Sequence, residues 1–304
     1  MIRYHEVIKR FAGRAAVDLM TAQIHRGDVT ALLGPNGSGK TTSLKMAAGL
    51  IRPDAGTITI GEPPLAAWMA SARAALSYLP QRVAFPEALT GGEVVDFYRQ
   101  LRGLPVERGA HALTFAGLNG AGSRAVATYS GGMVQRLGLA VAVMPEADAL
   151  LLDEPTAALD PEGLAAFYSL IEKRRRDGST VFFTSHQVAD VERLADRVLV
   201  LVKGRLVADF TRAELRRWLD ENGVMRIRVA RSDEAIDAIR RAGLTASLED
   251  SEIVIKGPAR ARAAVLEAVR AAGGTIQGLT AESGRLDALY MELVDGASPG
   301  DVSQ

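Results

Sequence analysis

The strongest constraint in this sequence is a glycine-rich segment that stands between an apolar run and a helical pattern. The segment reads Gly34-Pro35-Asn36-Gly37-Ser38-Gly39-Lys40-Thr41 and fits the pattern G-x-x-x-x-G-K-[ST]. The run Val29–Leu33 predicts a buried strand, and the residues from Thr42 to Ala48 predict a helix. Glycines let the backbone turn its N–H groups inward, and the start of a helix adds a partial positive charge. The segment therefore predicts a cradle for phosphate groups.

Two side chains of this cradle have predicted contacts of their own. Lys40 is expected to reach the β- and γ-phosphates of a nucleoside triphosphate, and the Thr41 hydroxyl is expected to bind magnesium. Apolar β-branched runs recur at residues 149–152, 180–183 and 198–202, with helical patterns between them. This alternation predicts an α/β fold with a parallel sheet. A phosphate cradle alone leaves kinases, GTPases and motor proteins open.

Two acids at the end of a predicted strand narrow the choice. The apolar run 149–152 is followed directly by Asp153 and Glu154. This placement puts both acids at the carboxyl edge of the sheet, where ligands bind in such folds. Asp153 can hold magnesium directly or through water. Glu154 can orient or deprotonate the water that attacks the γ-phosphate.

A third segment, Tyr129-Ser130-Gly131-Gly132-Met133-Val134-Gln135, resembles the signature of the ABC ATPases. Further motifs of that family occur in the expected order over roughly residues 2–217: Phe11 at the base-stacking position, Gln81 in the Q-loop, Asp160 in the D-loop and His186 at the switch histidine. The chain departs from the family at Phe11, where Tyr is common, and at Met133, where Gln is common. Adenine preference is therefore in more doubt than catalysis.

The resemblance implies a P-loop ATPase domain with a helical signature subdomain, and ATP and Mg²⁺ as cofactors. It implies that Phe11 stacks on adenine, that Gln81 reaches magnesium and the helical subdomain, and that His186 contacts the γ-phosphate. Donors at Ser130, Gly131 and Gly132, together with Asp160, would serve a nucleotide held by the other subunit of a head-to-tail homodimer. Hydrolysis would power a separate integral-membrane permease.

The sequence changes character beyond residue 217. Patterns of strand and helix alternate in the order βαββαβ, which is typical of a ferredoxin-like domain. We predict strands at 224–229, 245–248, 253–255 and 275–279, helices at 233–242 and 259–272, a final helix at 286–294 and a polar tail. The predicted organisation is an ATPase domain over residues 1–217 and a small α+β extension over residues 218–304.

Composition restricts where the protein acts. Lys plus Arg and Asp plus Glu both number 36, so the net charge is zero and no basic field indicates nucleic acid. The chain has no cysteine. Its charged start does not read as a secretory signal, and its longest apolar runs are shorter than the roughly 20 residues of a membrane helix. We expect it at the cytoplasmic face of the inner membrane, held there by its permease.

Two narrower interpretations come from the resemblance. Residues 79–98 and the closing run from Leu286 to Leu293 look like the exporter-type branch, and most like the ATPase of the transporter that helps mature the copper enzyme nitrous-oxide reductase. That likeness implies a periplasmic partner as well. The alternative is a non-transport ABC ATPase acting in regulation or macromolecular assembly, including one whose small domain senses a ligand. A chromosome-maintenance ATPase would need a long coiled coil between Lys40 and Asp153, and the interval is too short for one.

Overall fold

A computed structural model describes residues 1–230, 232–282 and 284–296 of the chain. The chain forms two compact units, Met1–Asp209 and Phe210–Gln304. We predicted a division after residue 217. The compact units divide earlier, within strand β10 (Arg205–Thr211), because the capping box of Thr211 and Glu214 starts helix α8 (Arg212–Glu221) as soon as this strand ends.

The first unit contains two sheets. The six-stranded sheet has the order β10-β9-β3-β8-β7-β6. Its remaining strands are β9 (Arg197–Val202), β3 (Val29–Leu33), β8 (Thr180–Ser185), β7 (Ala149–Asp153) and β6 (Leu76–Leu79). The four-stranded antiparallel sheet has the order β2 (Arg14–Ile24), β1 (Ile2–Phe11), β4 (Ala55–Ile60) and β5 (Leu65–Ala66).

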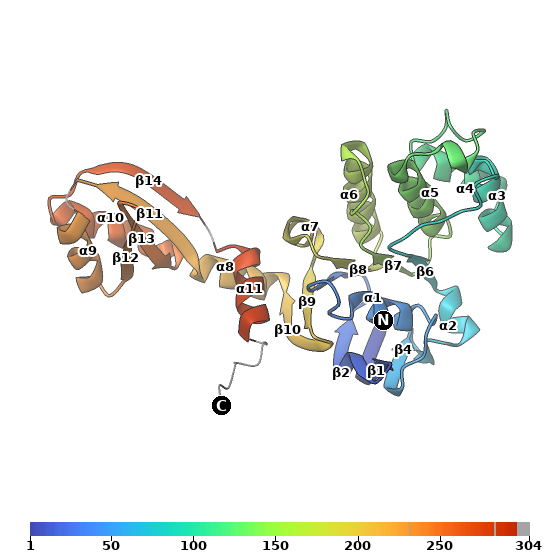
Figure 1. Cartoon of the computed structure of the whole chain (residues 1–304), viewed down its shortest axis with the longest axis horizontal. Coiled ribbons are helices and arrows are strands. Elements are labelled where there is room, and N and C mark those ends of the chain that lie inside the picture. The colour runs from blue at the N-terminus through green and yellow to red at the C-terminus, as the bar shows by residue number, and fades with distance from the viewer. Residues whose placement is uncertain (231, 283, 297–304) are drawn as a thin grey trace. The chain divides into compact units, whose positions relative to one another are not determined.

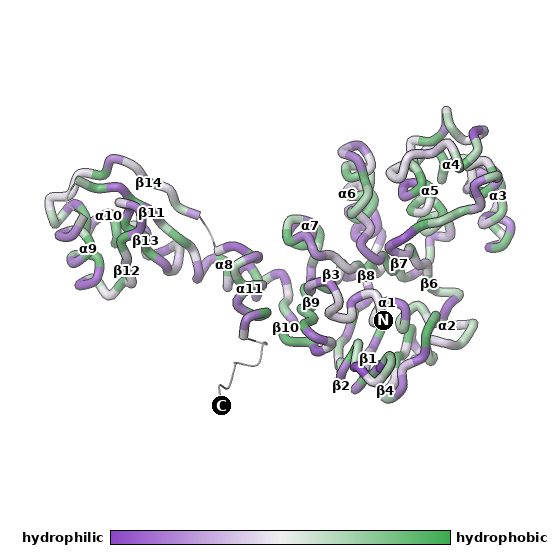
Figure 2. Tube along the Cα trace, in the orientation of Figure 1, coloured by the Kyte–Doolittle hydropathy of each residue, from purple (hydrophilic) through white to green (hydrophobic). Residues whose placement is uncertain are grey.

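The strands β9, β3, β8, β7 and β6 pair in parallel, as the alternating sequence pattern predicts. Both faces of this sheet are covered, so its central strands are buried along their whole length and are mostly apolar. The hydropathy colouring of Figure 2 is accordingly green along β9. Its core continues into the four-stranded sheet, where the rings of Phe182 and Tyr4 meet edge to face at 6.4 Å between centroids.

Eight helical segments belong to the described part of the first unit: α1 (Lys40–Ala47), α2 (Ala70–Ala74), α3 (Gly91–Leu101), α4 (Val106–Phe115), the 3-10 turn η1 (Val126–Thr128), α5 (Gly131–Val143), α6 (Pro161–Arg176) and α7 (Val188–Leu194). Helices α3, α4 and α5 pack around their own apolar cluster, which includes Val94, Val95 and Leu137, and form a helical subdomain (Figure 1). The signature segment opens α5 of this subdomain, in agreement with the prediction.

The second unit has the ferredoxin-like topology predicted from the sequence. Its strands are β11 (Gly223–Val229), β12 (Thr245–Glu249), β13 (Glu252–Gly257) and β14 (Ile276–Glu282), and its helical segments after α8 are α9 (Ser232–Arg241), the turn η2 (Ala259–Ala261), α10 (Arg262–Ala271) and α11 (Leu286–Gly296). The sheet order is β12-β13-β11-β14, and neighbouring strands are antiparallel. Alternate residues of β11 are buried against α9 and α10, and the residues between them are exposed. The predicted polar tail, residues 297–304, lies outside the described residues.

One detail of the helix ends differs from expectation. The Arg174-Arg175-Arg176 run in the last turn of α6 reads as a solvated helix end that compensates the helix dipole. Instead, Arg174 is buried and donates to the Val143 carbonyl, and Arg175 pairs with Asp196. Sequence spacing placed these side chains at the helix end but could not reveal the neighbouring elements that cover them.

We predict that Phe182→Ala lowers the free energy of unfolding of the first unit by about 3–5 kcal/mol, because the ring is fully buried and would leave a cavity. Each unit holds one tryptophan, Trp68 or Trp218. In a Trp218→Phe background, all tryptophan fluorescence comes from Trp68. Chemical denaturation followed by this fluorescence therefore reports on the unfolding of the first unit alone. The control is Ile227→Ala, an equally buried site in the separate core of the second unit; if it shifts the Trp68 transition as far, the division into two units is wrong.

Candidate functional site

The glycine-rich segment joins β3 to α1 at the carboxyl end of the strand. Gly39 has φ of 104°, and a Cβ atom there would lie 2.1 Å from the Ala16 carbonyl oxygen. A Cβ atom on Gly34 would lie 2.3 Å from the Leu201 carbonyl oxygen. Close packing therefore requires glycine at both positions, and the backbone conformation requires it at Gly39 as well. The loop is thus folded tightly against the neighbouring backbone.

Lys40 begins α1, and its ammonium group turns back into the loop. Nζ donates to the carbonyl oxygens of Gly34 at 2.8 Å and Pro35 at 3.2 Å, and lies 3.6 Å from Oε1 of Glu154. Burial lowers the pKa of Lys40, and the adjacent Glu154 carboxylate acts in the opposite direction. Without a ligand, the cation is held by weak acceptors and one acid beside an open cavity.

Asp153 ends β7 and lies fully buried beneath the loop. Its Oδ1 accepts hydrogen bonds from the hydroxyls of Thr41 at 3.1 Å and Thr184 at 2.7 Å. Its Oδ2 is buried and has no hydrogen-bond partner among the described residues. Burial raises the pKa of Asp153, the hydrogen bonds from Thr184 and Thr41 lower it, and the charge of Glu154 raises it.

Thr184 is a site residue that the sequence analysis missed. Its hydroxyl donates to Asp153 and accepts from the backbone N–H of Glu154 at 2.9 Å. A signal existed, because Thr184 lies near the end of an apolar strand that ends at the same sheet edge as β7. The register of β7 and β8 places Thr184 directly beside Asp153.

Glu154 follows β7 in an unusual backbone conformation and contacts three other predicted site residues. Its φ is 48°, in the left-handed region that non-glycine residues rarely occupy. Besides the Lys40 contact, Oε2 accepts from Nε2 of Gln81 at 2.9 Å and lies 3.4 Å from Nδ1 of His186. The strained turn aims a nearly buried carboxylate at the loop.

A cavity of about 420 Å³ opens between these groups. Seven predicted site residues line it, namely Asn36, Gly37, Gly39, Lys40, Thr41, Thr42 and Gln81, together with the predicted catalytic pair Glu154 and His186. Ala16 completes the lining. Four other predicted residues do not line the cavity, because they belong to the loop or to the layer beneath it: Gly34, Pro35, Ser38 and Asp153. The volume falls in the range of small-ligand sites.

The remaining predicted residues lie elsewhere. Phe11 ends β1 with half of its surface exposed and with Lys9 Nζ 5.4 Å from its ring centre, but it does not line the cavity. Ser130, Gly131 and Gly132 begin α5, where Ser130 Oγ accepts from the N–H of Met133 at 3.2 Å.

Asp160 is also outside the cavity lining. It begins α6, where Oδ1 accepts from the N–H of Gly163 at 2.9 Å. Its Oδ2 lies 3.7 Å from Arg136. Asp160 therefore caps the helix, as an acid directly before Pro161 at the first helical position favours, and the half-exposed side chain has a structural role in the single chain.

The fold and the cavity together define a phosphate-binding loop ATPase domain, and comparison with known proteins specifies its family. Residues 17–157 match the ABC transporter family. The linearmycin resistance ATP-binding protein LnrL of Bacillus subtilis is 30% identical over 77% of this chain and 77% of its own length. The daunorubicin/doxorubicin resistance ATP-binding protein DrrA of Streptomyces peucetius is 34% identical over 77% of this chain and 72% of its own length.

Solved structures of ABC ATP-binding domains have the same fold as this chain. An ATP-binding subunit of an ABC transporter, 26% identical, superposes with a TM-score of 0.66 over 71% of this chain and 92% of its own. A dimeric ATP-binding cassette in a post-hydrolysis state with ADP and Pi, 22% identical, shares the fold with a TM-score of 0.64 over 70% of this chain and 99% of its own.

The chain therefore belongs to the ABC transporter family as an ATP-binding subunit, and it is an ABC-type ATP hydrolase. Within the described residues, no helix combines the length and the apolar character required to cross a bilayer.

We predict that Asp153→Asn increases the free energy of unfolding of the ligand-free chain by about 1 kcal/mol at pH 7, because it removes a buried charge with an unpaired oxygen. The folded pKa lies above the ordinary value of 3.8, so the ionised carboxylate destabilises the fold at pH values above the folded pKa. This penalty disappears as the pH falls below 3.8, so the gain from the substitution should shrink in acid.

The matched control is Asp190→Asn. Asp190 is equally buried, but both of its oxygens accept hydrogen bonds at 2.6 Å, from Thr156 and Tyr168. This substitution should destabilise the chain by about 1–3 kcal/mol. Denaturation at several pH values checks both variants, and equal destabilisation by both would refute the assignment of Asp153 as an unsatisfied buried charge.

Proposed function

We propose that this chain binds ATP with magnesium in the 420 Å³ cavity and hydrolyses it with Glu154 as the water-activating carboxylate. The observation that carries the proposal is the convergence of Lys40, Gln81 and His186 on the Glu154 carboxylate at the cavity wall. A structural ion pair would not need a strained backbone or three different partners. The same group of contacts places a base, a cation and two polar side chains around one open space.

Lys40 and the loop backbone would hold the phosphates. The Nζ group donates to the neutral carbonyl oxygens of Gly34 and Pro35, and the anionic oxygens of a phosphate are stronger acceptors. If the Lys40 ammonium exchanged these carbonyl oxygens for the oxygens of a γ-phosphate, its contact with Glu154 would also be broken. Phe11, half-exposed at the end of β1, offers a ring face for adenine.

The residues present fit a magnesium ion. The orphaned Oδ2 of Asp153 and the Thr41 hydroxyl are hard oxygen ligands of the type that magnesium prefers, and Gln81 can approach it through water. When bound, the ion offsets the negative charge of the β- and γ-phosphates. Thr184 keeps Asp153 oriented through Oδ1, which leaves Oδ2 for the ligand.

Once Lys40 has turned to phosphate, the Glu154 carboxylate is free to accept a proton from water. Gln81 holds the other side of that carboxylate, and His186 lies within reach of both the carboxylate and the cavity. The water would attack the γ-phosphorus in line with the departing ADP oxygen, and its proton would pass to Glu154. The catalytic group is therefore positioned before the nucleotide arrives.

The signature residues would complete the site of a second copy. These residues do not line the cavity of their own chain: Ser130, Gly131, Gly132 and Asp160. They lie at the N-terminal ends of α5 and α6, where backbone N–H groups are available as donors. A head-to-tail homodimer would bring each set to the partner's nucleotide. The likeness to dimeric cassettes supports this arrangement through the shared fold.

Coupling to a separate membrane permease follows from the family, and export follows from the relatives. The relatives are named for resistance to linearmycin and daunorubicin/doxorubicin, and one from Burkholderia lata, 36% identical over 68% of this chain and 70% of its own length, for Nod factor export. We propose the cytoplasmic face of the cell membrane as the site of action. A role in copper-enzyme maturation with a periplasmic partner gains no support from these relatives and stays a prediction, as does the non-transport alternative.

We predict that Glu154→Gln lowers turnover by about 10²–10⁴-fold while ATP still binds, because the amide keeps the shape of the carboxylate but cannot accept the proton. Lys40→Ala should weaken ATP binding itself. Calorimetry for binding and phosphate release for turnover check both changes. Glu172→Gln, an exposed position on α6, is the control and should change neither. Turnover by Glu154→Gln near the unmutated rate would remove Glu154 from the catalytic role.

The composite site predicts a difference between two mixed dimers that contain the same substitutions. In the first, one subunit carries Lys40→Ala and the other carries Ser130→Arg, so one site keeps an intact loop and an intact signature. In the second, one subunit carries both changes and its partner none, so both sites are defective. Differently tagged, co-purified dimers should trap nucleotide only in the first arrangement. If each chain completes its own site, only the second arrangement will trap nucleotide.

A further inference from the structure

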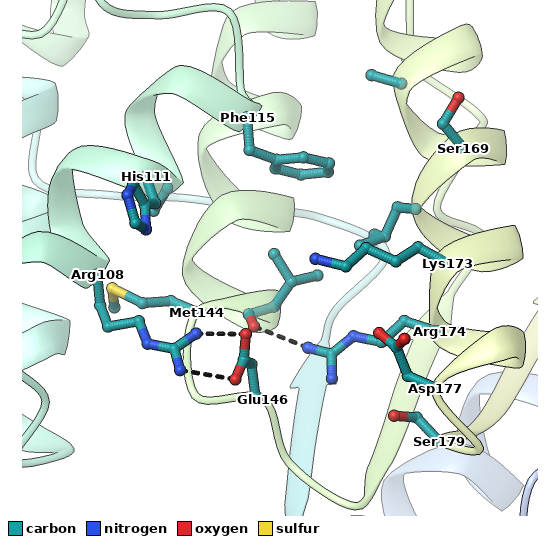
Figure 3. Close-up of a pocket in the computed structure, with 14 residues that line it drawn as sticks. Arg108, His111, Phe115, Met144, Glu146, Ser169, Lys173, Arg174, Asp177 and Ser179 are labelled. Atoms are coloured by element: carbon teal, nitrogen blue, oxygen red, sulfur yellow. Dashed lines mark hydrogen bonds and ion pairs between the residues drawn. The ribbon is translucent and has the colours of Figure 1, made fainter.

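A second and larger cavity, of about 690 Å³, lies in the first unit away from the nucleotide site. It is bounded by α4, by α6 and by the chain that follows α5, and it shares no lining residue with the smaller cavity (Figure 3). No step of the proposed mechanism uses it. Its charged side chains, taken one by one, indicate what it can bind.

Arg108 is fully committed within the protein. Its guanidinium forms two contacts with the Glu146 carboxylate, one of them Nη2 to Oε2 at 2.7 Å, drawn as a pair of dashed lines in Figure 3. Glu146 is held in the left-handed region with φ of 51°. The two charges therefore cancel at one wall of the cavity.

Arg174, on the opposite wall, is a buried cation with too few partners. Its side chain is 8% exposed, and its one hydrogen bond among the described residues joins Nη2 to the Val143 carbonyl oxygen at 2.9 Å. No carboxylate in the described part of the chain lies within ion-pair distance of it. Burial lowers the pKa of Arg174, and the charges of Glu146 and Asp177 partly oppose this effect. The N–H groups of this guanidinium that make no protein contact are not sealed from solvent, so an anion in the cavity can reach them and form a charge-assisted hydrogen bond.

Lys173 adds a second free cation. Its ammonium extends into the cavity between Phe115 and Arg174 (Figure 3), and it has no hydrogen bond or ion pair within the described residues. Asp177 is the only lining acid that does not neutralise Arg108. The uncommitted groups of the cavity are therefore two cations and one anion, with a net positive charge.

The rest of the wall is apolar and includes an aromatic ring. Phe115 faces the cavity in Figure 3, where Met144 lies on the side of Arg108. Leu170 also lines the cavity. A site that joins an apolar wall to a small number of fixed charges is typical of small-molecule pockets. Inorganic phosphate would satisfy the cations but leave this wall exposed to water.

We propose that this cavity binds a small organic acid, with its carboxylate between Lys173 and Arg174 and its aromatic or aliphatic body against Phe115. A carboxylate matches the planar fork of a guanidinium and supplies the missing negative charge. Because α5 ends at this cavity and α6 passes it, the bound acid would join the helical subdomain to α6. The site is defined by the ligand-free first unit and does not depend on the proposed ATPase mechanism.

The test is calorimetric titration of the full chain, without nucleotide, with 1-naphthoate, indole-3-acetate and octanoate. At least one acid should bind saturably with a Kd of about 1 mM or tighter. Lys173→Glu should weaken that binding at least about tenfold, because a charge-assisted contact becomes a repulsion. Arg176→Ala, an exposed arginine on the same helix outside the lining, should leave it unchanged.

Two further arms separate this site from non-specific association. Ser169→Trp, at the exposed rim on α6, should block binding without touching either cation. 1-Naphthylmethylammonium, which has the same ring and the opposite charge, should not bind. Any one of four outcomes would overturn the proposal. The amine binds as tightly as the acid, inorganic phosphate binds with equal affinity, neither Lys173→Glu nor Ser169→Trp weakens the binding, or none of the three acids binds.

Discussion

The parallel register between β7 and β8 is the constraint on which the nucleotide site depends. It places Thr184 beside Asp153, so that one hydroxyl orients the buried acid and also accepts the N–H of Glu154. The next strand, β3, continues the same edge into the glycine-rich loop. The sheet thus sets the separation of loop and acids through backbone hydrogen bonds, and long flexible side chains need only span the last few ångströms.

The site is assembled at the expense of stability. Lys40 and Asp153 are both buried, Asp153 with one oxygen that has no partner among the described residues, and the pKa values of both groups move in the directions that disfavour the charged forms. A ligand with phosphate oxygens and a divalent cation supplies what each lacks. The burial of these two charges therefore accounts for the affinity for a magnesium-bound triphosphate that we propose for this site.

Sequence reasoning predicted the features that rest on local patterns and failed where distant segments meet. Features that depend on spacing within one segment were predictable. They are the strand, loop and helix around Lys40, the helix start at Asp160 and the βαββαβ order of the second unit. The burial of Arg174 and the role of Thr184 were not predictable, because each depends on which elements pack side by side. The resemblance predicted that Phe11 contacts adenine and that Ser130 contacts the other subunit's nucleotide; both residues lie outside the cavity lining of their own chain, and these roles stay predictions.

The left-handed backbone of Glu154 has a genetic consequence. Glycine adopts φ near 48° without strain, and one nucleotide change converts either glutamate codon into a glycine codon. In a chain that only bound nucleotide, or that served chiefly as a sensor, this change would relieve the backbone and remove a nearly buried charge. The backbone at this position therefore does not itself require glutamate, and what the carboxylate adds there is its contacts with Lys40, Gln81 and His186.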